Sequence, residues 1–472
     1  MKRSKRIIAL VAILVVACIV TFALTKYEKK QEEIQNSDAI ILEIPTDTVQ
    51  ELSWKYTEDG LAFHKGDDGW LYDDDDAFPV NEEKITDILS HFEAFGVSFI
   101  IENVEDYSQY GLKEPECVIN LTTSDQSYEI KLGDFSKMDE QRYVDIGDGN
   151  VYLVSKDPMD YLEKELSSMI LHDDTPDFEK VVDIQFAGSE NYTVVYTEES
   201  ANTYNKDDVY FTEKDGKTLP LDTDTVTNYL DTITSLNLQG YVTYNATEEE
   251  LESYGLDEPE LSVTVNYTYT DEEKNEISDS CVLHISRNPE ELKAAEEAED
   301  NKEDEIPNVT KYVRIGDSQI VYTLDDSTYD TLAASSYNDL RHREVIWADF
   351  NIVTQIDITL EGETHAITST VDEKNDDVRI WYYDKKEIDI NNLQTALTTL
   401  AANSFTSQAA DQKEEISLTV HLDNENFPQI QIQLFRYDGT LCLAVVDGES
   451  ISLVERSSVI NLVEAVQAIV LN

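Results

Sequence analysis

Basic side chains are scarce in this chain of 472 residues. Lys and Arg together number 35, against 98 Asp and Glu, which gives a formal net charge of −63. A nucleic-acid-binding protein needs a basic surface to neutralise phosphates, so we expect no nucleic-acid partner. The hydrophobic fraction of 41% still supplies enough apolar side chains for sizeable cores. The length suits about two to four domains.

Cysteine is also rare, and its four positions form no recognisable site. Cys18 lies in an apolar N-terminal run, whereas Cys117, Cys281 and Cys442 each lie in a predicted strand. This spacing fits neither a disulfide framework nor a zinc site. We therefore expect the three strand cysteines to be buried free thiols.

Catalytic and cofactor-binding motifs are absent from the sequence. It lacks the G-x-S-x-G elbow of serine hydrolases, the phosphate-binding loop G-x-x-x-x-G-K-[ST] and the dinucleotide motif G-x-G-x-x-G. None of the seven histidines is paired at metal-binding spacing: His64, His91, His172, His284, His342, His365 and His421. The sequence thus predicts no enzyme and no cofactor, with a hydrolase site assembled from distant residues as a minor alternative.

One long hydrophobic run is present, at residues 7–24, and it carries no charge. At about 1.5 Å per residue, a helix over this run would be about 27 Å long, close to the thickness of a bilayer core. The basic residues 1–6 predict that the N-terminus stays inside the cell and that the rest is exported. We favour an uncleaved single-pass anchor in the cell membrane. A lipoprotein modified at Cys18 and a cleaved secretory signal are the alternatives.

Two short motifs each occur twice. Tyr-Gly-Leu-x-Glu-Pro-Glu begins at Tyr110 and at Tyr254, and Tyr-Val-x-Ile-Gly-Asp begins at Tyr143 and at Tyr312. Alternating apolar residues flank the second motif on both sides of a Gly-Asp turn, which predicts a β-hairpin. The glycines of these two turns are Gly147 and Gly316. A third, weaker hairpin pattern surrounds Asp447 and Gly448.

The Tyr-Gly-Leu motif predicts a corner at the entrance to a strand. Gly111 and Gly255 permit positive φ, and Pro115 and Pro259 disfavour helix, so the chain enters the next strand extended. The apolar members of the motif are expected to pack back onto their own repeat: Tyr110, Leu112, Tyr254 and Leu256. A ligand-binding role for the tyrosines is the alternative.

Each repeat combines strands, an amphipathic helix, the corner, further strands and a second helix. The second helices are expected at 157–169, 326–340 and 456–470. The first helices follow from apolar residues at helical spacing: Ile85, Ile88, Leu89, Phe92 and Phe95; Val226, Tyr229, Leu230 and Ile233; Leu393, Leu397 and Leu400. Antiparallel hairpins with two helices per unit, after one N-terminal transmembrane helix, predict an α+β fold of tandem repeats.

The predicted division of the chain follows from these signals. The segments are a cytoplasmic tail (1–6), a transmembrane anchor (7–24), a juxtamembrane linker (25–47), repeat unit 1 (48–174), repeat unit 2 (175–345) with an acidic insertion at 288–308, and a degenerate repeat unit 3 (346–472). We expect the insertion to be an exposed loop with, at most, a helical turn.

Four consecutive carboxylates, Asp73, Asp74, Asp75 and Asp76, are a weak candidate for a divalent-cation site. Calcium takes oxygen ligands, but consecutive residues do not converge on one ion. We therefore expect a solvated hairpin tip here, with cation binding as the weaker interpretation.

Tyr-Gly-Leu-x-x-Pro, followed by a strand and a Gly-containing hairpin that ends near Val-Tyr, resembles the bacterial domain-of-unknown-function family 4340. The two better copies cover most of residues 60–345, whereas the third repeat has no Tyr-Gly-Leu before 414–422. The resemblance implies an envelope accessory role beside ABC-type transport systems of the gliding-motility kind. It implies no catalytic residues.

Together these observations predict a membrane-anchored, extracytoplasmic accessory or scaffold protein, associated with an ABC-type transport system through a permease or another envelope protein. The alternative is an extracytoplasmic module that binds cell-wall glycan, peptide or a divalent cation.

Overall fold

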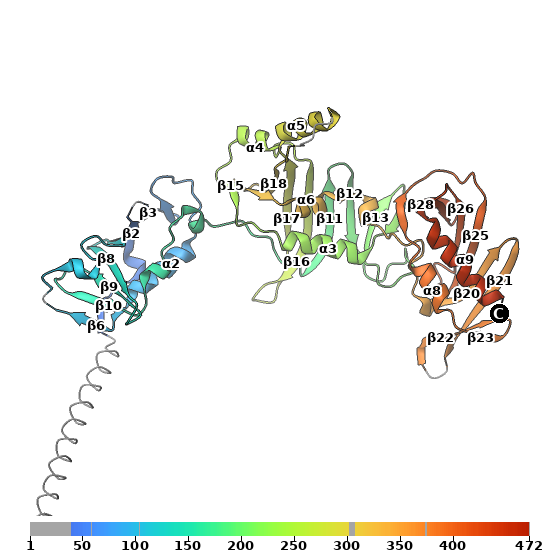
Figure 1. The fold of residues 1–472 in the computed structure, drawn as a ribbon, viewed down its shortest axis with the longest axis horizontal. Helices are drawn as coiled ribbons and strands as arrows, with labels where there is room; N and C mark the ends of the chain where they lie inside the picture. Colours follow the sequence, from blue (N-terminus) through green and yellow to red (C-terminus); the bar gives the residue numbers. More distant parts are fainter. Residues whose placement is uncertain (1–38, 58, 103, 302–306, 373–374, 472) are drawn as a thin grey trace, which may run out of the picture. The chain divides into compact units, whose positions relative to one another are not determined.

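A computed structural model describes residues 39–57, 59–102, 104–301, 307–372 and 375–471. Contacts within the chain divide it into two compact units (Figure 1). The first compact unit ends at Asp173 and the second begins at Asp174. Every strand pair in the described chain is antiparallel (all 24 register sets share this direction).

The first compact unit contains an eight-stranded sheet in the order β4-β3-β2-β7-β8-β9-β10-β6, and a small sheet of β1 and β5. Its elements are β1 (Ala39–Leu42), η1 (Thr46–Thr48), β2 (Val49–Tyr56), β3 (Gly60–Lys65), β4 (Trp70–Tyr72), α2 (Glu82–Glu93), β5 (Phe95–Val97), β6 (Phe99–Ile101), η2 (Tyr107–Tyr110), β7 (Cys117–Thr123), β8 (Ser127–Ser136), β9 (Gln141–Asp145), β10 (Val151–Val154), η3 (Pro158–Asp160) and η4 (Leu166–Met169).

The second compact unit contains two nine-stranded sheets. The first has the order β14-β13-β12-β11-β16-β17-β18-β19-β15. Its elements are β11 (Lys180–Ala187), β12 (Asn191–Tyr196), β13 (Tyr210–Lys214), β14 (Lys217–Pro220), α3 (Thr223–Thr234), β15 (Tyr241–Thr243), α4 (Glu248–Tyr254), β16 (Leu261–Thr270), β17 (Glu276–Arg287), α5 (Pro289–Asp300), β18 (Lys311–Ile315), β19 (Val321–Leu324), α6 (Asp326–Ala333) and α7 (Tyr337–Leu340).

The other nine-stranded sheet has the order β23-β22-β21-β20-β25-β26-β27-β28-β24. Its elements are η5 (Phe350–Ile352), β20 (Val353–Leu360), β21 (Glu363–Asp372), β22 (Asn375–Tyr383), β23 (Lys386–Ile388), α8 (Asn391–Thr398), β24 (Ala402–Phe405), β25 (Glu414–Leu422), β26 (Gln429–Arg436), β27 (Leu441–Val446), β28 (Glu449–Glu455) and α9 (Arg456–Val470).

All three large sheets follow one topological rule. A first meander is followed by a helix, a short strand after the helix (β6, β15 or β24) pairs at the far edge, and a second meander fills the middle. The two nine-stranded sheets have identical strand orders, and the eight-stranded sheet has one strand fewer in its first meander. The third repeat, in which the sequence motifs are weakest, therefore has the same topology as the second.

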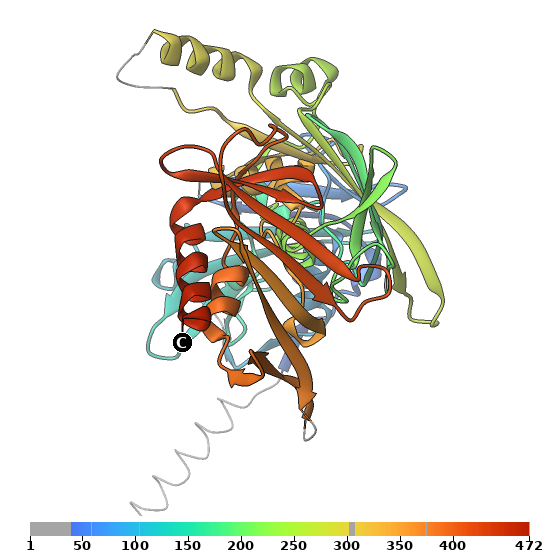
Figure 2. The same ribbon diagram turned by 90° about the vertical axis from the view of Figure 1, so that its right-hand side faces the viewer.

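The predicted first helices are confirmed as α2, α3 and α8, except that Phe95 lies in β5 and Leu400 lies beyond the end of α8. Each buries the apolar face that the sequence spacing indicates, for example Ile85 and Phe92 in α2. Asn81 and Asp222 begin α2 and α3 by accepting hydrogen bonds from two backbone amides each, which satisfies otherwise unpaired N–H groups. Figure 2 shows α9 running alongside α8 in the third repeat.

The predicted α+β fold with two helices per repeat is wrong. Strand accounts for 42% of the structure and helix for 23%, so antiparallel sheet dominates. The described α-helices are also distributed unevenly, with one in the first repeat, five in the second and two in the third. The helix expected at 326–340 is divided into α6 and α7, whereas the one at 456–470 is α9.

The helix expected at 157–169 is replaced by two short 3₁₀ turns, η3 and η4. The sheet provides the reason. Trp54 Nε1 donates to the carbonyl of Glu163 at 2.7 Å, and the Tyr56 hydroxyl donates to the carbonyl of Leu162 at 2.8 Å. These carbonyls are paired with side chains of β2, which holds the segment against the sheet in an irregular path.

The acidic insertion is more ordered than the expected loop. Its first part forms α5, in which the Asn288 side chain accepts from the amides of Glu290 and Glu291. Ala295 and Ala298 are buried, and α5 lies beside α4 (Figure 1). A proline at the first helical position and small alanines on the packed face explain why this charged segment forms a helix.

Within the described residues, no helix is both long and apolar enough to cross a membrane. The longest, α9, has 15 residues, whereas a spanning helix needs about 20. This finding corrects both the transmembrane helix of the predicted fold class and the predicted single-pass localisation in the cell membrane. Residues 7–24 and Cys18 themselves lie outside the described residues.

The three strand cysteines are confirmed as buried free thiols. Cys117 lies in β7, Cys281 in β17 and Cys442 in β27. Burial raises the pKa of each thiol to about 11, so none of them is a thiolate at neutral pH.

Candidate functional site

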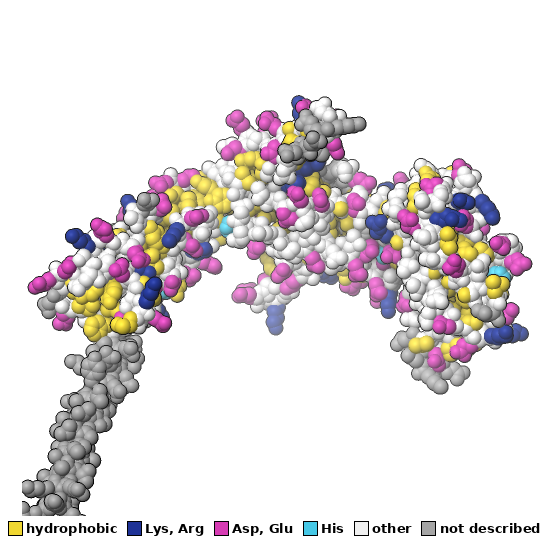
Figure 3. Space-filling view, in the orientation of Figure 1, with side chains coloured by type: hydrophobic (Ala, Val, Ile, Leu, Met, Phe, Trp, Pro, Cys, Tyr) yellow, Lys and Arg dark blue, Asp and Glu magenta, His cyan; other side chains and the backbone are white. Residues whose placement is uncertain are grey.

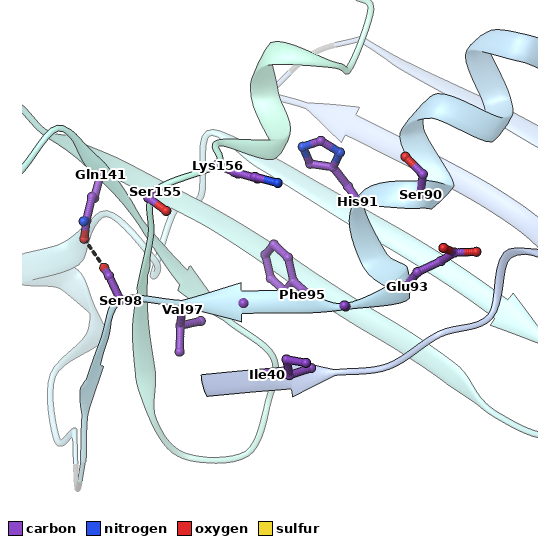
Figure 4. A pocket seen from close by; sticks show the side chains of 12 residues that line it. Ile40, Ser90, His91, Glu93, Phe95, Val97, Ser98, Gln141, Ser155 and Lys156 are labelled. Carbon is purple, nitrogen blue, oxygen red and sulfur yellow. Dashed lines mark hydrogen bonds between the residues drawn. The ribbon is translucent and has the colours of Figure 1, made fainter. Parts of the chain in front are cut away.

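A pocket of about 560 Å³ opens in the first compact unit where α2 leads into β5 (Figure 4). Helix α2 contributes His91, β5 contributes the buried Phe95, and the segment after β10 contributes Lys156. Gln141 at the start of β9 accepts a hydrogen bond from the Ser98 hydroxyl, drawn as a dashed line in Figure 4. The pocket therefore combines an aromatic floor with polar groups from four separate elements.

His91 is the most unusual group of this pocket. Its Nε2 is buried and has no hydrogen-bond partner among the described residues. Burial and the nearby Lys156, which points toward the imidazole in Figure 4, lower the pKa of His91 below its ordinary value of 6.5. The ring is therefore neutral at neutral pH, and its centroid lies 3.8 Å from that of the Tyr161 ring, with an interplanar angle of 45°.

The charges around the pocket suit a polar ligand. Lys156 supplies a cation, and Glu93 supplies a carboxylate that accepts from the Thr46 hydroxyl at 3.0 Å. A neutral imidazole can donate and accept hydrogen bonds, so His91 can pair with a hydroxyl or an amide. Such a set of groups fits an uncharged or zwitterionic molecule with several hydroxyl or amide groups.

An exposed apolar edge lies in the same unit. Strand β6 is the last strand of the eight-stranded sheet, and within the described chain it pairs only with β10. Phe99 and Ile100 of β6 are 37% and 38% exposed, and Ile40 at the pocket is 51% exposed. Figure 3 shows hydrophobic side chains gathered over this end of the unit, on a surface that is otherwise rich in Asp and Glu. We call Phe99–Ile101 the β6 edge.

The Tyr-Gly-Leu motif is a helix C-terminus in both copies. The amide of Leu112 donates to the carbonyl of Tyr107, and the amide of Gly111 donates to that of Ser108. The second copy repeats this pattern from Leu256 and Gly255 to the last turn of α4. Both glycines have φ of 71°, and these paired bonds define a Schellman motif.

The two repeated motifs contact each other, which their separation in the sequence did not reveal. The rings of Tyr110 and Tyr143 lie 5.0 Å apart between centroids, and those of Tyr254 and Tyr312 lie 4.8 Å apart. Leu112 and Leu256 are buried beneath the corners. Pro115 and Pro259 each precede a strand, β7 and β16, by two residues.

The last glutamate of the motif binds an arginine in both copies. Glu116 accepts from Arg142 Nη1 at 2.9 Å, while Arg142 Nε bonds to buried Asp157. Glu260 accepts three bonds from Arg287, two of them from Nε, and a fourth from the Tyr329 hydroxyl.

These hydrogen bonds also affect the pKa of Glu260. Burial alone would raise the pKa of Glu260, but the bonds from Arg287 and Tyr329 outweigh it and lower this pKa. Both glutamates therefore join the corner to an arginine of a neighbouring strand.

The remaining predicted site residues are dispersed. Gly147 and Gly316 lie in the exposed turns of the β9–β10 and β18–β19 hairpins with positive φ. The four consecutive aspartates follow β4 and have separate partners rather than a common centre. Asp73 accepts from His64, Asp74 from the Tyr72 hydroxyl, and Asp75 from the amide of Ala77; Asp76 is exposed.

Sequence reasoning missed the pocket because its groups come from residues 40, 90–98, 141 and 155–156. One signal was available. His91 lies on α2 outside the predicted apolar face, in the last turn, next to the short apolar strands β5 and β6. A histidine at such a position borders the sheet edge rather than open solvent.

The fold and its repeated corners define the class of this protein. It consists of tandem antiparallel sheet units, with Schellman corners before the strands β7 and β16. A model of the family described as Domain of unknown function (DUF4340) matches residues 70–259 and, again, residues 212–419. The matches start 142 residues apart, close to the 144 residues between the two Tyr-Gly-Leu motifs. They cover well over half of the sequence, so the chain belongs to this family. No curated protein matches it.

Proposed function

We propose that this chain is a non-catalytic accessory or scaffold protein that binds a protein partner through the β6 edge. The observation that carries the proposal is the exposure of Phe99 and Ile100 on a strand that, within the described residues, pairs along one side only. An open strand edge presents unpaired N–H and C=O groups, which can accept a strand from another chain.

The choice of partner rests on the family. The family resembles envelope proteins that occur beside ABC transport systems of the gliding-motility kind. We therefore propose that the binding partner is a component of such a system, for example its permease. The strongly acidic surface would select a partner segment that is apolar or basic, because like charges across an interface are unfavourable.

Crosslinking from the β6 edge tests this proposal. A photoreactive residue at position 99 should capture a transport-system component in cells that express the chain. Phe99→Lys with Ile100→Lys should abolish the interaction. Leu171→Lys, at a residue that is 56% exposed in the same compact unit, should retain it. Capture that survives the double substitution, or that yields no transport component, contradicts the proposal.

The pocket favours a second function, binding of a small polar ligand such as a cell-wall glycan fragment or a peptide. The supporting observation is the buried, unpaired Nε2 of His91 beside Lys156. Calorimetric titration with muropeptides and with glycan oligomers should give saturable binding. Lys156→Ala should weaken it, and Lys137→Ala, at an exposed site outside the pocket, should not. Heats of dilution alone for every ligand would eliminate this candidate.

A further inference from the structure

In the second compact unit, the segment 341–347 after α7 brings one histidine next to three carboxylates. His342 Nε2 lies 2.9 Å from Asp208 Oδ1. On the other side of the ring, Nδ1 lies 3.9 Å from both Asp222 Oδ2 and Glu344 Oε2. The three atoms on this second side are all within 4.8 Å of one another.

The orientation of the imidazole is set by its surroundings. A carboxylate only accepts hydrogen bonds, so Nε2 is the donor to Asp208 and the neutral ring has its lone pair on Nδ1. Asp208 is itself held by bonds from Trp347 Nε1, at 3.1 Å, and from the Thr203 hydroxyl. The Trp347 ring stacks on the imidazole at 4.3 Å between centroids with an interplanar angle of 12°.

The three ligand atoms, His342 Nδ1, Asp222 Oδ2 and Glu344 Oε2, lie close together and are available to bind an ion. The His342 side chain is only 10% exposed, and no described residue forms a hydrogen bond with its Nδ1. Asp222 uses Oδ1 to cap α3 through the amides of Asp224 and Thr225, which leaves Oδ2 available. Glu344 accepts no hydrogen bond within the described chain, and its side chain is 38% exposed, so it can rotate.

We propose that His342 Nδ1, Asp222 Oδ2 and Glu344 Oε2 bind one divalent transition-metal ion, with Zn²⁺ as the best fit. Imidazole with two carboxylates is a ligand set that zinc accepts, with water in the fourth position. Tetrahedral bonds of about 2.0 Å place ligand atoms about 3.3 Å apart, so the three atoms, at 3.9 Å from Nδ1 to each carboxylate oxygen and within 4.8 Å of one another, would have to draw together by side-chain rotation.

Asp208 is the positioning residue of this site. Metal-binding histidines usually donate their second ring N–H to a carboxylate, which orients the ring and increases the basicity of the bound nitrogen. The Asp208–His342 bond supplies this arrangement, and the Trp347 ring restricts rotation of the imidazole.

Within the described residues, no Lys or Arg forms an ion pair with Asp222 or Glu344. Arg341 lies over the rings of Tyr337 and Phe405, at 4.9 and 4.5 Å from their centroids. Arg343 donates to the carbonyl of Ala402. A divalent ion would compensate the charge of the two carboxylates that lie beside His342 Nδ1. The bound ion would tie the start of α3 to the segment that leads into the third repeat.

Titration of the EDTA-treated 472-residue chain with ZnCl₂ tests the proposal. Calorimetry should show one site per chain that excess Mg²⁺ does not displace, and zinc should raise the melting temperature of the second compact unit. Glu344→Gln and His342→Ala should each weaken binding at least about tenfold, and Asp208→Asn by about 10- to 100-fold. His421→Ala is the matched control, because His421 bonds to a single carboxylate, Asp357.

The outcomes separate a built site from diffuse binding to an acidic surface. Loss in the first three variants with retention in His421→Ala supports the proposal. Equal zinc binding by the wild-type chain and Glu344→Gln would overturn it, as would zinc binding that Mg²⁺ displaces. Should His342→Ala fail to fold, Glu344→Gln decides the question, since the half-exposed Glu344 tolerates an amide of the same shape. Circular dichroism of each variant verifies folding.

Discussion

Replacing Gly255 by alanine tests how strongly the Tyr-Gly-Leu corner depends on close backbone contact. A Cβ at this position would lie 2.8 Å from Ser286 Oγ and 3.1 Å from the carbonyl oxygen of Arg287. The left-handed backbone costs an L-residue about 1–2 kcal/mol. Crowding against a buried strand adds about 1–3 kcal/mol. We therefore expect Gly255→Ala to lower the free energy of unfolding of the second compact unit by about 2–5 kcal/mol.

Gly216→Ala is the matched control. Gly216 lies in the β13–β14 turn with φ of 74°, and an added Cβ there would meet no atom within 4 Å. It should show only the conformational cost of about 1–2 kcal/mol. The effect of each alanine on the unfolded chain is the same and cancels in the comparison.

Hydrogen–deuterium exchange read by peptide is the appropriate assay, because the chain has two compact units and exchange reports on each of them without assuming two-state unfolding of the whole chain. Protection of β16 and β17 should fall more in Gly255→Ala than in Gly216→Ala, with the first compact unit unchanged. Equal losses in the two variants would refute the argument that the corner approaches β17 closely.

Three further predictions concern the first compact unit. Asp157→Ala leaves the Arg142 guanidinium buried with fewer partners, so it should lower the free energy of unfolding by about 3 kcal/mol in urea denaturation. Adding Arg142→Met to the Asp157→Ala variant should restore much of this loss. An Asp157→Ala variant as stable as the wild type would contradict the prediction. Because burial and a neighbouring lysine lower the pKa of His91, the unfolded chain binds a proton more readily. Stability should fall as the pH drops below about 6.5, and His91→Gln should flatten this slope in melting curves at pH 5 and pH 8. Tyr56→Phe removes the donor to a buried carbonyl and should cost about 1–2 kcal/mol, measured by the same urea titration; no change would mean that water replaces the hydroxyl.

Periodicity predicted the elements whose packing is local. In α2, residues Ile85, Ile88, Leu89 and Phe92 recur at helical spacing, and the same residues are buried. The hairpins at Gly147 and Gly316 were also readable, since alternation and a turn glycine lie within a few residues of each other. These signals depend on neighbours in the sequence, so one chain suffices to read them.

Elements decided by distant partners could not be read in this way. Residues 157–169 have helical spacing, but Trp54 and Tyr56, more than 100 residues earlier, take the carbonyls that a helix would use. The histidine cluster is similar. His342 and Glu344 are two positions apart in the sequence, whereas Asp208 and Asp222 come near them only through the fold. The pair alone matches no metal-binding spacing.

The strongest sequence signal, the Tyr-Gly-Leu motif, describes a connection rather than the sheet. In the first and second repeats, residues 102–116 and 244–260 connect the far-edge strand to the second meander, and each ends in a Schellman corner. In the third repeat the same connection is the shorter segment 406–413, without a corner, yet its sheet has the strand order of the second. Each long connection contains a helical turn, which must end and change direction before the next strand begins. The short connection leads from one strand to the next without such a turn. Loss of the motif in the third repeat therefore reflects a shortened connection and not a different fold.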